Sequence, residues 1–113
     1  MNTLKNKVQL LGNLGTLPEV RTTQNGNKMA RLRIATNETY KNAQGEKITD
    51  TQWHTAIAWG KTAEIAELYL SKGSEVMVEG RLQHREYTDK DGAKRTATEV
   101  QVVNLLLLDR KAA

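Results

Sequence analysis

The sequence contains no cysteine and no phenylalanine, and each absence limits what the protein can be. Without cysteine, its 113 residues form no disulfide and no thiolate metal site, and His54 and His84 cannot complete a structural zinc site on their own. Without phenylalanine, the core has to be built from Leu, Ile, Val, Met and Ala. We therefore expect no metal and no cofactor. The positions of the two Trp and three Tyr are therefore informative, because so few aromatic residues are not expected to serve as ordinary core residues.

Long apolar runs are also missing. The longest, Leu105–Leu108, is far shorter than the roughly 20 apolar residues that span a bilayer as a helix. The segment Met1–Asn13 lacks the apolar centre of a secretion signal. We therefore expect a protein that stays in the cytoplasm and has no membrane partner. Lys and Arg number 17 against 13 acidic residues, a net charge of +4, which suits a nucleic-acid partner but is common among unrelated small proteins.

A single domain is expected over residues 1–108, followed by a short C-terminal end, 109–113. Alternating polarity and turn residues predict a chain made mostly of strands. The polar segments Glu38–Asp50 and Tyr87–Arg95 are expected to form a long hairpin excursion and a charged loop. The predicted strands are Lys5–Leu14 with a short continuation through Glu19–Thr23, then Lys28–Thr36, Thr51–Trp59, Glu75–Gln83 and Thr96–Leu108.

Gly60–Lys72 is the one segment with a convincing helical pattern, because Ala63, Ala66 and Leu70 recur at spacings of three and four. Tyr69 continues a second row at helical spacing and is expected in the core. The predicted order is therefore three strands, a helix and two strands. This is the order of the OB-fold, an all-β, five-stranded Greek-key barrel with its one helix between strands three and four.

The third predicted strand carries Trp53 and Trp59 on one face, since side chains alternate across a strand. Two tryptophans on one face also suit a core cluster. On the second predicted strand, however, Arg31 and Arg33 share a face, and the opposite face, with Leu32, is the natural core side. If the arginines lie beside the tryptophans, the surface has aromatic rings for bases and cations for phosphates, as single-stranded nucleic acid requires. Stacking accepts any base, so the predicted binding has no sequence preference.

Tyr40 and Tyr87 stand at the edges of the two polar segments, each close to basic residues. A tyrosine at the base of a loop is often a structural plug. Nevertheless, four of the five aromatic residues lie either on one predicted strand or at the base of a loop. Core packing alone does not readily explain this distribution. The four therefore favour a binding surface.

No arrangement of nucleophile and base is found, so no catalytic residue is expected. The lone His54 lies among small residues and is expected to be packed or at a subunit contact rather than catalytic. We therefore expect a binding protein rather than an enzyme.

Seven segments, in the same order, resemble bacterial single-stranded DNA-binding proteins. The likeness runs from about Asn6 to Val103, nearly the whole chain, and the ordered set of motifs is highly specific. The segments are Asn6–Gly15, Pro18–Arg21, Ala35–Tyr40, Gln52–His54, Trp59–Glu64, Tyr69–Ser74 and Val78–Leu82.

The resemblance implies a protein that coats and protects single-stranded DNA during replication, recombination and repair. Proteins of this family stack bases on four aromatic positions, which fall on Tyr40, Trp53, Trp59 and Tyr87. The resemblance also implies a homotetramer with His54 near a subunit interface, and a cytoplasmic location at the nucleoid. By the same resemblance, the basic positions along the DNA path correspond to Lys7, Arg21, Lys61, Lys72 and Arg85. The strand pattern adds Arg33 to this set.

The sequence also departs from the family pattern. Tyr40 and Tyr87 stand where many relatives have tryptophan, and Gln83 and Glu86 stand where some have a basic residue. Relatives usually continue into a linker with an acidic tip that recruits replication and repair proteins. The sequence given ends at Asp109–Ala113 without such a tip, so the recruitment of these partners is not carried over from the resemblance.

Two other interpretations remain open. One is an OB-fold accessory of primosome assembly, although such proteins lack most of the stacking aromatics. The other is an OB-fold module whose aromatic face docks a polypeptide.

Overall fold

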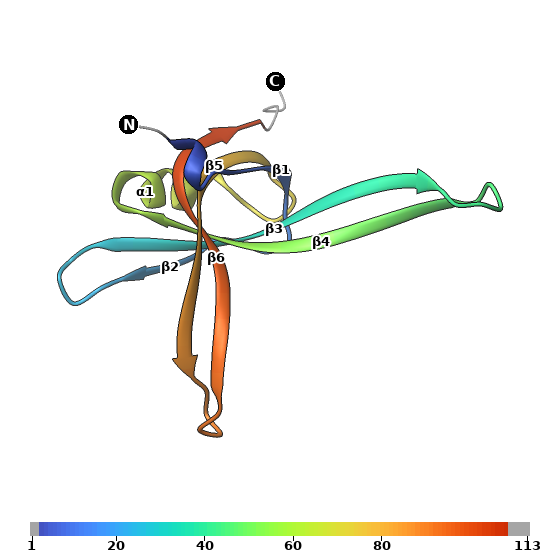
Figure 1. Ribbon diagram of the computed structural model, residues 1–113. Coiled ribbons are helices and arrows are strands. Elements are labelled where there is room, and N and C mark those ends of the chain that lie inside the picture. Colours follow the sequence, from blue (N-terminus) through green and yellow to red (C-terminus); the bar gives the residue numbers. More distant parts are fainter. Residues whose placement is uncertain (1–2, 109–113) are drawn as a thin grey trace.

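Figure 1 presents the computed structural model, which describes residues 3–108. The expectation for the short end, 109–113, lies outside the described residues. A short 3-10 helix, Thr3–Lys5, precedes the first strand. The elements that follow are β1 (Val8–Leu14), β2 (Glu19–Thr22), β3 (Lys28–Lys41), β4 (Lys47–Trp59), α1 (Gly60–Tyr69), β5 (Glu75–Thr88) and β6 (Lys94–Leu107).

The strands close into a barrel. They hydrogen-bond in the order β1-β5-β6-β4-β3-β2, and β1 also pairs with β3, which joins the two sides of the sheet. β4 and β6 are parallel, with Ala56 opposite Val100, whereas the other pairs are antiparallel. The prediction of a mostly-β chain with a closed barrel of five strands and one helix is therefore confirmed for the described residues. In chain order the helix follows β4, because Glu19–Thr22 forms a separate short strand.

The barrel core is aliphatic, as the absence of phenylalanine requires. Leu32, Ile34, Val76 and Val78 are fully buried, and small residues of α1 pack against them. Burying a side chain of this size stabilises the fold by about 1.5–3 kcal/mol. The predicted core face of β3 is thus confirmed, which leaves the alternate face of the same strand, with Arg33, directed outward.

The helix differs from its prediction at the C-terminal end. It ends at Tyr69 rather than Lys72. Ala63, Ala66 and Leu70 are buried, as their spacing predicts, but the expectation that Tyr69 lies in the core is wrong, since 57% of its surface is exposed. Leu70 takes the buried position, and its neighbour Tyr69 is turned about a quarter of a turn away from the core.

Two antiparallel ribbons extend far beyond the barrel (Figure 1). β3 and β4 pair from Met29 opposite Trp59 to Lys41 opposite Lys47. β5 and β6 pair as far as Thr88 opposite Lys94. The predicted strands stop several residues earlier, because the outer parts are polar on both faces and lack an apolar alternation. Their backbone groups bond to each other, so the ribbons form without a core beneath them.

The hairpin turns at Thr23–Asn27, Asn42–Glu46 and Asp89–Ala93 share one construction. In each, a glycine with φ near +80° donates its N–H to the carbonyl of the first residue. The side-chain oxygen of that first residue accepts the N–H of the fifth. Positive φ favours glycine, which explains why Asn25-Gly26 and Asp91-Gly92 are reliable turn signals in this sequence.

Candidate nucleic-acid interface

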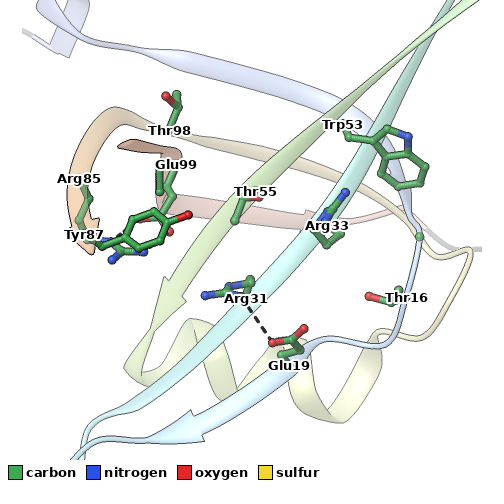
Figure 2. Close-up of a pocket in the computed structure, with 12 residues that line it drawn as sticks. Thr16, Glu19, Arg31, Arg33, Trp53, Thr55, Arg85, Tyr87, Thr98 and Glu99 are labelled. Carbon is green, nitrogen blue, oxygen red and sulfur yellow. Dashed lines mark hydrogen bonds and ion pairs between the residues drawn. The ribbon is translucent and has the colours of Figure 1, made fainter. Parts of the chain in front are cut away.

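A groove of about 700 Å³ crosses the outer face of the barrel. Figure 2 shows Trp53 at one end of it, Tyr87 and Arg85 at the other, and Arg31 and Arg33 between them. The full lining comprises Gly15, Thr16, Glu19, Arg31, Arg33, Trp53, Thr55, Arg85, Tyr87, Ala97, Thr98 and Glu99.

The β3–β4 register brings the arginines and tryptophans to one face. Arg33 lies opposite Thr55, and Ala35 lies opposite Trp53. Residues opposite each other in an antiparallel pair point to the same side of the sheet. The predicted face of β4, with Trp53 and Trp59, therefore lies beside Arg31 and Arg33, which the sequence pattern left as a condition.

Trp53 is held at the groove end by contacts on two sides. The guanidinium carbon of Arg33 lies 5.5 Å from the centroid of the Trp53 ring, within the range of a cation–π interaction. On its other flank the indole packs on Gly15, where an added Cβ would lie 2.5 Å from the ring. The ring is nevertheless 53% exposed. It is thus a positioned aromatic surface that faces solvent.

Tyr87 forms the opposite end of the groove. The guanidinium carbon of Arg85 lies 5.6 Å from the centroid of the Tyr87 ring. Arg85 also donates from Nε and Nη2 to the two carboxylate oxygens of Glu99, at 3.3 and 3.2 Å. The hydrogen bond to Glu99 and the charge of that carboxylate raise the pKa of Arg85, which stays charged. Both ends of the groove therefore combine an aromatic ring with an arginine.

Trp59 lies in a second hollow of about 310 Å³ that shares Arg31, Arg85 and Glu99 with the groove. The Trp59 Nε1–H donates to Gln101 Oε1 at 3.0 Å, which fixes the direction of an indole that is 45% exposed. The two hollows together carry Trp53, Tyr87 and Trp59 along one continuous surface.

Tyr40 does not line this surface. It lies on the β3–β4 ribbon opposite Ile48 and is 55% exposed. Within β3, Tyr40 has an even residue number, whereas the groove residue Arg33 has an odd one. Alternation therefore assigns Tyr40 to the other face of the ribbon.

The remaining predicted cations lie at several places. Arg21 lies opposite Met29, which is opposite Trp59, so this cation extends the face that carries Trp59. Lys61 is exposed in the first turn of α1 and Lys72 in the loop that follows the helix. Neither lines the groove.

Lys7 and His54 are engaged elsewhere. Lys7 pairs with Glu79 at 3.2 Å on the outer face of β1 and β5. Asn104 first and Lys7 second lower the pKa of Glu79 through hydrogen bonds. His54 is half-buried on the face of β4 opposite Trp53, with Nε2 2.9 Å from Thr36 Oγ1.

Several groove residues were not selected as site residues from the sequence. The strand pattern gives Arg31 a face but no role, and it gives Glu99, Gly15 and Gln101 no role in a site. Their position depends on the meeting of β1, β3 and β6 around the barrel, a contact between distant segments that local patterns do not encode. Within residues 3–108, the structure contains no cluster of His, Asp and Glu suited to a metal ion, and no helix there is long and apolar enough to cross a membrane.

These observations define a closed β-barrel with an outward groove of aromatic rings and arginines. The chain belongs to the single-strand binding protein family, whose family model matches residues 5–108. It is 43% identical, over 94% of its length, to Single-stranded DNA-binding protein 1 of Chlorobaculum tepidum, and it spans 66% of that protein, slightly less than two thirds.

Solved structures agree in fold. The Plasmodium falciparum SSB in complex with ssDNA matches with a TM-score of 0.84 and 28% identity, covering 92% of this chain and 95% of that one. A deletion mutant of the single-stranded DNA binding protein from Thermus aquaticus matches with a TM-score of 0.79 and 30% identity, covering 92% of this chain and 50% of that one. The barrel is therefore that of the OB-fold structures of this family.

Proposed function

We propose that this protein binds single-stranded DNA without sequence preference and without catalysis, and that it coats and protects the strand in replication, recombination and repair. The observation that carries the proposal is the groove in which Trp53 and Tyr87 each lie beside an arginine. The similarity to a complex of the Plasmodium protein with ssDNA supports the same function.

The physical basis is stacking combined with phosphate neutralisation. Each base stacked on an aromatic ring contributes about 1–3 kcal/mol, and every base has a face to stack. Arg33 supplies a cation beside Trp53. Arg31 lines the same groove, and its side chain is 37% exposed, so the outer part of its guanidinium would supply a second cation for the strand.

We propose a DNA path that runs from Trp59 across the groove to Trp53 and reaches Tyr40 further along the β3–β4 ribbon. Tyr40 lies on the alternate face of that ribbon, so the strand would have to wrap around it. Such a path places the cations as backbone contacts at successive points. Those cations are Arg33, Lys7, Arg21, Lys61, Lys72 and Arg85.

The domain assignment and assembly belong to the same proposal. We propose residues 1–108 as the OB-fold DNA-binding domain, with the helix between strands three and four if β1 and β2 are counted as one interrupted strand along β3. We propose a homotetramer in the cytoplasm, at the nucleoid. The half-buried His54 would lie near a subunit contact, and a cross-strand row of Leu11, Met77 and Leu106 offers an apolar face. A molar mass by sedimentation equilibrium of four times the 12.7 kDa chain mass would support the tetramer. A molar mass equal to that of one chain would exclude it.

The function is tested by titrating intrinsic tryptophan fluorescence with oligo(dT) at several salt concentrations, with a duplex as the control ligand. Strong quenching by oligo(dT), weaker as salt rises, is expected, because the bases would cover Trp53 and Trp59. An unchanged signal and no binding at low salt would contradict the proposal and favour a protein-interaction module.

A further inference from the structure

Glu99 is an acidic residue at the floor of a groove whose lining also contains three arginines, Arg31, Arg33 and Arg85, and one other acid, Glu19. Glu99 is only 6% exposed, whereas the cations around it reach solvent. It lines both the main groove and the Trp59 hollow, as do Arg31 and Arg85. A carboxylate in this place opposes an anionic ligand, so its presence needs a physical role.

The contact with Arg85 supplies that role. Arg85 lies two residues from the position opposite Glu99 on the neighbouring strand, and the guanidinium meets both carboxylate oxygens. Two parallel N–H to oxygen bonds are the geometry that arginine also uses for phosphate. Nη1 takes no part in these two bonds, and the Arg85 side chain, which lines the groove, is 48% exposed.

The other two groove arginines are held less closely. Arg31 Nη1 lies 3.7 Å from Glu19 Oε2, and the Glu19 side chain is 55% exposed. Arg33 forms no ion pair within the described residues. Glu99 is thus a buried carboxylate that accepts two hydrogen bonds from one of the groove arginines, Arg85.

We propose that Glu99 is a built-in competitor of the DNA phosphate for Arg85. The inference rests on the proposed function and deepens it. The Arg85–Glu99 pair has no net charge, so Arg85 touches the strand through its free edge without adding to counterion release. Glu99 thereby limits affinity at this end of the groove and leaves stacking on Tyr87 as the main local interaction.

The test compares the salt dependence of oligo(dT) binding for the wild type, Glu99→Gln and Glu19→Gln, measured by anisotropy of a labelled strand. For single strands the slope of log K against log salt changes by about 0.7 for each phosphate neutralised. We expect Glu99→Gln to bind more tightly at low salt with a slope steeper by up to this amount, equivalent to about a threefold larger loss between about 50 and 200 mM salt. Glu19→Gln removes a charge from the same groove, but its partner is loosely held. We expect a smaller change from it.

A slope for Glu99→Gln that equals or falls below that of the wild type would overturn the inference and make Glu99 a scaffold residue. If wild-type protein itself fails to bind oligo(dT), the proposed function fails instead, and the two failures are distinguishable.

The double variant R85Q/E99Q keeps the test valid if E99Q alone unfolds, which thermal melting would reveal. It replaces a neutral ion pair by a neutral amide pair, so we expect the wild-type slope. A slope shallower by about 0.7 would mean that Arg85 neutralises a phosphate despite Glu99, and would overturn the inference.

Discussion

The guanidinium of Arg33 lies against the ring of Trp53, with 5.5 Å between the guanidinium carbon and the ring centroid. This contact joins a cation to a stacking surface, on the face of β3 opposite the fully buried Leu32 and Ile34. One strand therefore builds the core with alternate residues and the binding groove with the residues between them.

Replacing Arg33 by alanine tests the phosphate contact. We expect Arg33→Ala to weaken oligo(dT) binding mainly at low salt and to make the slope of log K against log salt shallower by about 0.7. Lys28→Ala is the matched control, because Lys28 is bound to Glu67 at 2.6 Å beside the helix. Equal slopes for Arg33→Ala and the wild type would exclude Arg33 as a phosphate contact.

Replacing Trp53 by alanine tests stacking. Loss of one stacked base is expected to cost about 1–3 kcal/mol of binding free energy, a factor of roughly 5 to 150 in Kd. Tyr69→Ala is the control, since Tyr69 is similarly exposed but lies on α1 outside the groove. Anisotropy titrations of both variants provide the comparison. A loss of the same size in both would show that the effect is not specific to the groove.

Alanine substitutions at Gly15 and Gly12 are expected to distinguish an effect on DNA binding from an effect on folding stability. A Cβ on Gly15 would lie 2.5 Å from the Trp53 ring, so the half-exposed indole would have to leave its position beside Arg33. Gly15→Ala is therefore expected to stay folded but to bind oligo(dT) more weakly. A Cβ on Gly12 would lie 2.2 Å from the Ala35 carbonyl oxygen, so Gly12→Ala is expected to destabilise the barrel. Urea unfolding and DNA titration measure the two effects. Unchanged binding by Gly15→Ala would mean that the position of Trp53 is unimportant.

Asp89 stabilises the β5–β6 turn in a pH-dependent way. The hydrogen bond from Arg95, and then that from the Ala93 N–H, lower the pKa of Asp89 below its usual 3.8. Because the folded pKa is the lower one, the stabilisation is present above pH 3.8 and is lost as the pH falls through the folded value.

An NMR titration of the Asp89 carboxyl measures this pKa directly. We expect a midpoint below 3.8 in the wild type and a shift back toward 3.8 in Arg95→Gln. A wild-type midpoint at or above 3.8 would contradict the hydrogen-bonded turn.

The sequence predicted the barrel well because its core strands alternate and its turns contain Asn-Gly and Asp-Gly pairs. The same alternation correctly placed Trp53 and Trp59 on one face, and Arg31 and Arg33 on one face of the preceding strand. It did not determine that the two faces lie side by side, which follows from the β3–β4 register. Local patterns failed where no core is present, as in the polar ribbons beyond Thr36, and at Tyr69, where helical spacing alone did not fix which residue is buried.

The contacts that define the groove floor could not be predicted in the same way. Glu99 meets Arg85 diagonally between two neighbouring strands, and Gly15, whose N–H donates to the Arg33 carbonyl, meets Trp53 across β3. Both contacts depend on strand register, which the sequence pattern restricts but does not determine.

The most direct measurement of the central claim is photo-crosslinking with an oligo(dT) strand in which thymine is replaced by 5-iodouracil, followed by peptide mapping. We expect adducts on Trp53, Trp59 and Tyr87, which line one surface. Adducts confined to Tyr69, or none with a strand that demonstrably binds, would contradict it.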